Sequence, residues 1–83
     1  MNESKMRILA KNNNVKALEY LRNREIIKKY LNKIEKIKTQ FPGIDKKQDT
    51  ITKVFHYGKL MAYSEFLLNL NLINTNILET LEN

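Results

Sequence analysis

Residues 15–41, VKALEYLRNREIIKKYLNKIEKIKTQF, decide the fold of this chain. Their apolar side chains recur at alternating intervals of three and four residues, the spacing of one face of an α-helix. The repeating positions are Tyr20, Ile27, Tyr30, Ile34, Ile37 and Phe41, and Asn23 is the one polar break in the series. The pattern predicts a helix over residues 15–40, capped by Asn13 or Asn14 and about 39 Å long.

The residues that follow predict a turn and a second long helix. Phe41-Pro42-Gly43 ends the first helix, because proline disfavours helical geometry in the residue before it and glycine permits a turn. Asp45 and Gln48 have the spacing of a capping box, so we expect the second helix to begin near residue 46 and continue to about residue 70. So short a connection makes the two helices antiparallel neighbours.

Shorter elements are expected at both ends of the chain. A short helix over residues 3–11 is followed by three consecutive asparagines, and residues 1–14 form either this helix or a flexible arm. The sequence Asn-Leu-Asn at residues 69–71 weakens the second long helix. A capping-box spacing that begins at Asn76 then predicts a short C-terminal helix.

Composition limits the chain to one small helical domain. It has 83 residues, of which 42% are apolar, and 15 Lys and Arg against 9 Asp and Glu give a net charge of +6. This length is too short for two independent cores, the absence of Cys excludes a disulfide scaffold, and two Gly and one Pro argue against an all-β fold. The sequence therefore predicts a single all-α domain over residues 1–83, a long antiparallel helical hairpin with short N- and C-terminal helices.

The same composition bears on location and origin. The chain has no run of 18 apolar residues and its first residues lack the apolar stretch of a secretory signal, which favours a cytoplasmic protein without membrane contact. Lys (12 copies against 3 Arg), Asn (11) and Ile (9) are abundant, as is typical of AT-rich coding sequences. A small helical protein of this composition resembles many short accessory proteins of phages and plasmids, which often act by binding.

The second long helix is more apolar than one partner helix requires. We expect its packing face to consist of Ile51, Phe55, Gly58, Ala62, Phe66 and Ile73. Leu60 and Leu67 point almost the opposite way, so a third helix or another chain has to cover them. The short C-terminal helix covers little area, and we therefore expect a homodimer. The candidate protein interface consists of Leu60, Tyr63, Leu67, Leu70 and Leu78.

The first long helix carries a basic stripe opposite its apolar face, formed by Arg22, Lys29, Lys33 and Lys36. Such a stripe either neutralises the phosphates of DNA or RNA or is an ordinary solvated surface. The charge is also uneven, because residues 1–59 hold all 15 basic and six acidic residues (+9), whereas residues 60–83 hold only three Glu (−3). This polarity indicates either an electrostatic role near the loop and a partner-binding role at the other end, or codon drift without a selected role.

No residues have the spacing of a catalytic, cofactor or metal site. His56 is the single histidine and lies three residues before Lys59, but nothing in the sequence activates it as a base. Two glycines cannot form a phosphate-binding loop, and one histidine without cysteines offers no set of metal ligands. We therefore expect no enzyme activity, cofactor, metal or small-molecule substrate.

Two functions remain open from the sequence. The first is a non-enzymatic regulator or inhibitor that associates with a host protein through its helices, because the second long helix carries surplus apolar surface. The alternative is a nucleic-acid-binding accessory protein that uses the basic stripe.

Overall fold

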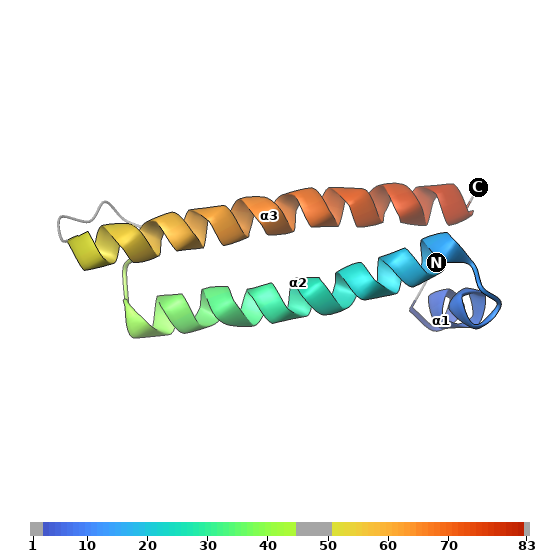
Figure 1. The fold of residues 1–83 in the computed structure, drawn as a ribbon, viewed down its shortest axis with the longest axis horizontal. Coiled ribbons are helices and arrows are strands. Elements are labelled where there is room, and N and C mark those ends of the chain that lie inside the picture. Colours follow the sequence, from blue (N-terminus) through green and yellow to red (C-terminus); the bar gives the residue numbers. More distant parts are fainter. Residues whose placement is uncertain (1–2, 45–50, 83) are drawn as a thin grey trace.

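The computed structural model describes residues 3–44 and 51–82, except for the side chain of Thr52. These residues form three α-helices, α1 (Glu3–Lys11), α2 (Val15–Gln40) and α3 (Ile51–Glu82), and contain no strand. Figure 1 shows α2 and α3 lying antiparallel, with α1 at the N-terminal end of α2. The molecule is elongated, with extents of 51 × 18 × 16 Å. The predicted all-α helical hairpin is confirmed.

Helix α2 has the bounds that the sequence predicts, because both of its ends carry the expected signals. Asn14 is the N-cap, and its side-chain oxygen accepts a hydrogen bond of 3.0 Å from the Ala17 N–H. The preceding Asn13 has a φ of 63°, a left-handed conformation that asparagine tolerates better than most residues. At the other end, the Phe41 N–H donates the last helical hydrogen bond, and Gly43 turns the chain with a φ of 78°.

Helix α3 is longer than predicted, because it continues through residues 69–71 to Glu82. The residues around Asn76 are helical as expected, but they extend α3 and form no separate helix. The expected break is absent: Asn69 and Asn71 lie exposed within the helix, and the inward-pointing Asn74 beyond them hydrogen-bonds across to α2. The expected start near residue 46 and its capping box lie outside the described residues.

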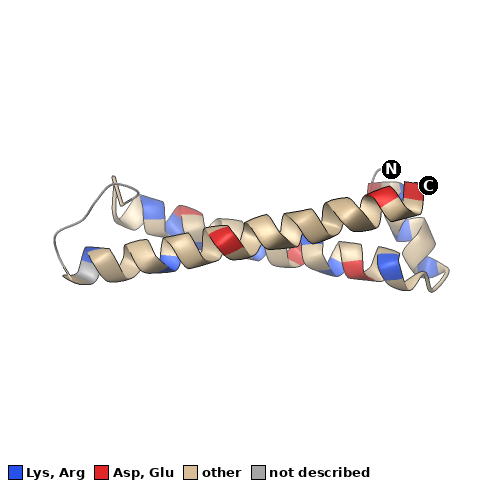
Figure 2. Cartoon of the chain, turned by 90° about the horizontal axis from the view of Figure 1, so that it is seen from above, with Lys and Arg blue, Asp and Glu red and all other residues tan. Residues whose placement is uncertain are grey.

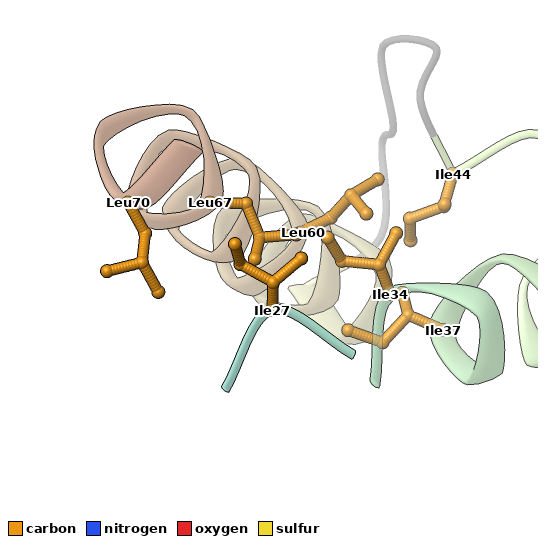
Figure 3. Close-up of a cluster of buried hydrophobic side chains, with 7 residues drawn as sticks. All are labelled: Ile27, Ile34, Ile37, Ile44, Leu60, Leu67 and Leu70. Carbon is orange, nitrogen blue, oxygen red and sulfur yellow. The ribbon is translucent and has the colours of Figure 1, made fainter. Parts of the chain in front are cut away.

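The core lies between α2 and α3. Ile27, Ile34 and Ile37 of α2 pack against three leucines of α3, and Ile44 closes the cluster at the loop end (Figure 3). We call the buried side of α3 the inner face, which consists of Leu60, Leu67, Leu70, Asn74 and Ile77. The predicted packing face of this helix is therefore wrong. The inner face packs against α2 because its residues are spaced three and four apart without a break to the C-terminal end of α3. The apolar stripe on α2 continues with the same spacing towards the N-terminus of that helix.

A buried pair of asparagines fixes how the two long helices align. The Asn23 side-chain amide donates a hydrogen bond of 2.9 Å to the side-chain oxygen of Asn74, and the side-chain NH₂ of Asn74 donates one of 3.2 Å to the Tyr20 carbonyl. Phe41 lies 18 residues after Asn23 and stacks on His56, which lies 18 residues before Asn74. One antiparallel register therefore holds over this whole length. A sliding of the helices would bury the amides without partners, which is unfavourable.

Helix α1 covers the end of the hairpin near the termini. It packs against α2, and the Met6 side chain is completely buried, as is Ala17 on α2. Of the two alternatives for residues 1–14, the short helix is thus the one observed for the described part of that segment. Within the described residues, no helix combines the length and apolarity needed to cross a membrane.

Candidate interaction surfaces

The predicted protein interface coincides largely with the core of the chain. Leu60, Leu67 and Leu70 are only 4–9% exposed and pack against α2, so none of them is available to another molecule in this fold (Figure 3). Tyr63 is half-buried, and its ring meets that of Tyr30 edge-on at 5.3 Å. The expectation that Leu60, Tyr63, Leu67 and Leu70 face away from α2 is wrong, because the opposite face of α3 is the one turned away from it.

Leu78 is the remaining member of the predicted interface. It is half-buried and borders a small depression between α2 and α3, which Tyr20 and Asn74 also line. It therefore lies at the edge of the core rather than on a free surface.

The free apolar surface lies on the other side of α3. We call it the outer face. Its eight large side chains are between 42% and 91% exposed. They are Ile51, Val54, Phe55, Met61, Phe66, Leu68, Leu72 and Ile73. All six residues predicted to pack against α2 lie on this face: four of them belong to the eight, and Gly58 and Ala62 lie between them. Glu65 lies within this strip by its spacing, and the ammonium group of Lys59 lies over the ring of Phe55.

Gly58 sits in the middle of the outer face. It is exposed, and a Cβ atom added to it would meet nothing within 4 Å. Although the sequence places Gly58 on the packing face of this helix, α2 does not approach it. A glycine inside a helix costs about 1 kcal/mol relative to alanine, and no contact within the described residues offsets that cost.

The basic stripe of α2 is only partly a free surface. Arg22, Lys29 and Lys36 are exposed, and they repeat every seven residues, so they form one row along the helix. Lys33 is half-buried, and its ammonium nitrogen lies 4.9 Å from the ring centre of Tyr30 and 5.8 Å from that of Tyr63. Cation–π contacts of this kind hold the ammonium group against the hairpin. Three of the four predicted residues therefore remain free to meet a phosphate.

Lys and Arg are unequally distributed between the two long helices, but α1 and the first turns of α2 also place basic residues at the end near the termini. Figure 2 shows basic residues along α2 and at the loop end of α3, whereas the only charged residues in the rest of α3 are glutamates. The row on α2 also borders a shallow depression lined by Lys36, Glu35 and three polar residues of the same helix. Because a single helix supplies that whole lining, the depression is the surface of α2 and no cleft between elements.

His56 packs in the aromatic end of the core. Its ring stacks on Phe41 at 4.3 Å between centres and meets Phe55 edge-on at 5.5 Å. Its Nδ1 atom is buried and has no hydrogen-bond partner among the described residues. Lys59, the neighbour expected from the sequence, lies instead over the Phe55 ring at 4.9 Å. The structure thus places His56 in an apolar stack and does not pair it with a group that could activate it.

No group of three or more potential metal ligands occurs among the residues of the described segments. Comparison of the chain with protein-family models, curated proteins and solved structures found no match. The outer face is therefore the strongest candidate site, and the sequence already contained the signal for it. On α3, apolar or aromatic residues at 60, 63, 67, 70, 77 and 81, with one asparagine at 74, match the spacing on α2, which also contains one asparagine. That match leaves the other apolar strip without a partner.

Proposed function

We propose that this protein is a non-enzymatic protein-binding regulator or inhibitor that engages its partner through the outer face of α3. The observation that carries the proposal is the set of eight large apolar side chains, each at least 42% exposed, on one side of a single straight helix. Monomeric proteins scatter exposed apolar residues singly, and a contiguous strip of them marks an interaction site.

The shape of the molecule supports the same proposal. α2 covers only the inner side of α3, α1 packs on α2, and the hairpin presents the other side of α3 along its full length (Figure 1). An amphipathic partner helix or a hydrophobic groove fits such a straight apolar surface. We propose a cytoplasmic role of the kind performed by short phage- or plasmid-encoded proteins, which the Lys-, Asn- and Ile-rich composition favours.

The second candidate is a nucleic-acid-binding protein that uses the basic row. The exposed Arg22, Lys29 and Lys36 favour it, because a row of cations gives salt-dependent binding to phosphates. We rank it lower because solvated lysines are stable without any ligand, whereas exposed apolar side chains favour burial by about 25 cal/mol for each Å² removed from water.

Position-specific photo-crosslinking separates the two functions. Benzoylphenylalanine replaces either Leu68 on the outer face or Lys36 on the basic row, in cells of the native host. We expect light-dependent protein adducts from position 68, and none from position 36. Nuclease-sensitive adducts from position 36, together with no protein adduct from position 68, would replace the proposal with the nucleic-acid function.

A further inference from the structure

We propose that the partner of the outer face is a second copy of this chain, and that the two α3 helices pair antiparallel about a two-fold axis near Ala62. The product is a four-helix dimer in which each hairpin contributes α2 and α3. This inference rests on the proposed function, because it names the occupant of the same surface.

The area of the outer face agrees with the requirement of a stable dimer. Eight large side chains with exposed fractions of 42–91% present on the order of 800 Å² of mostly apolar surface. The largest apolar patch on a typical monomer is about 300–600 Å², and a standard interface buries about 800 Å² per partner. A helical surface of this size can therefore supply one half of a symmetric interface.

The spacing of the outer-face residues is that of a helix pair. Val54, Met61 and Leu68 repeat every seven residues, and Leu72 continues the row four residues later. A seven-residue repeat keeps one row of side chains against a partner helix along its length. The same spacing on the inner face is already matched by α2, so the outer row provides α3 with a second, independent contact surface.

Charge selects the antiparallel arrangement. Both basic residues in the described part of α3, Lys53 and Lys59, precede the apolar strip's midpoint, and the glutamates at 65, 79 and 82 all follow it. A parallel pair would place like charges side by side. An antiparallel pair brings the basic end of each α3 towards the acidic end of the other, and it separates the two basic hairpin loops.

The positions of large and small side chains along α3 place the two-fold axis of this dimer near Ala62. The apolar strip extends from Ile51 to Ile73, and Ala62 is its midpoint. Gly58 and Phe66 lie four residues on either side, so the axis brings the large ring of one copy to the level of the glycine of the other. An exposed glycine that no contact among the described residues explains is thereby given a role, because it leaves room for a bulky neighbour.

Single cysteines test the arrangement cleanly, since the chain has no Cys of its own. Ala62→Cys lies beside its own copy at the axis, so we expect mild oxidation to convert the chain into a disulfide dimer. Formation should be about a hundredfold faster than for Lys36→Cys at micromolar concentration, because pairing raises the local thiol concentration to the millimolar range. Equal rates for these two variants would overturn the proposal.

A second pair of variants tests direction. Ile51→Cys and Ile73→Cys are 22 residues apart, about 33 Å along a helix, so neither meets its own copy in an antiparallel dimer. We expect a disulfide between them when the two variants are mixed and little when each is oxidised alone. Rapid self-linking of Ile51→Cys would show a parallel dimer and overturn the inference.

Sedimentation equilibrium of the unlabelled chain gives the independent measurement. We expect a mass of twice 9.9 kDa for the natural sequence, and a loss of affinity of about a hundredfold for Leu68→Asp with its helical circular dichroism retained. A natural chain that stays at 9.9 kDa up to millimolar concentration would overturn self-pairing. If position 68 still crosslinks to a different protein in cells, the proposed function survives that result. If position 68 yields no protein adduct at all, both fail.

Discussion

The inner and outer faces of α3 are both apolar, yet the described residues cover only one of them. The inner face carries an unbroken series of residues three and four apart and one asparagine, and α2 carries the same series. The outer face is as rich in large side chains, but Glu65 and Asn69 interrupt it and α2 does not reach it. The difference shows that matching pattern between two helices, and not apolar content alone, selects the face that a helix buries.

Adjacent substitutions give the largest contrast between the two faces. Leu67→Asp places a carboxylate in the core against Ile27 and Ile34, and we expect a loss of about 4–5 kcal/mol, enough to unfold so small a domain. Leu68→Asp lies 61% exposed on the outer face and should leave the folded chain intact. Circular dichroism at 222 nm with urea titration measures both. Unfolding of the two variants to the same degree would remove the distinction between the faces.

The asparagine pair provides the next largest effect. Asn74→Ala leaves the Asn23 amide buried without its partner, and we expect a loss of about 2 kcal/mol in the free energy of unfolding. Replacing both Asn23 and Asn74 with leucine removes the unpaired groups, so stability should return to the natural level or exceed it. Urea titration checks the order of the three proteins. Equal stability of the single and double variants would mean that the hydrogen bond between α2 and α3 is not what the pair contributes.

The double leucine variant also tests how the register is set. Without the asparagines, only shape distinguishes one antiparallel alignment from a shift by one heptad. We expect additional sets of amide resonances in its nuclear magnetic resonance spectrum, while the natural chain shows one. A single sharp set of resonances would mean that the aromatic contacts at the loop end, where Phe41 stacks on His56, set the register.

The sequence predicts the parts of this fold that depend on local signals. The bounds of α2, its Asn14 cap and the end at Phe41 follow from periodicity and capping within a few residues. The buried face of α3 could not be taken from that helix alone, because two apolar strips compete on it. Only comparison with α2, whose single buried Asn23 demands a polar partner, identifies the strip that contains Asn74. The candidate site was misplaced for the same reason.

Like Asn23 and Asn74, His56 is a polar residue at the contact between α2 and α3, but unlike theirs, its polar group is not fully hydrogen-bonded. Its buried Nδ1 has no hydrogen-bond partner among the described residues, while its ring packs on Phe41. His56→Phe keeps the stacked ring and removes the unpaired atom, so we expect a gain of about 1 kcal/mol in unfolding free energy. Thermal unfolding measures it, with His56→Ala as the control that loses the ring. A loss of stability in the Phe variant would reveal a polar contact to His56.

Gly58→Ala has the smallest expected effect, and its sign depends on whether the outer face is covered. In the separate chain, the added methyl group meets no atom within 4 Å, so we expect a gain of about 0.5–1 kcal/mol from helix propensity alone. In a dimer, the same methyl group occupies the space opposite Phe66 and weakens association. The variant should therefore be more stable than the natural chain in dilute solution and lose that advantage as concentration rises, because dimerisation stabilises only the natural chain by mass action.

Ala62→Gly is the matched control for helix propensity, since it lowers helix stability at the same face without adding bulk. A gain for Gly58→Ala that stays constant from micromolar to millimolar protein would mean that nothing approaches the outer face closely, and the two faces of α3 would then differ only in what covers them within one chain.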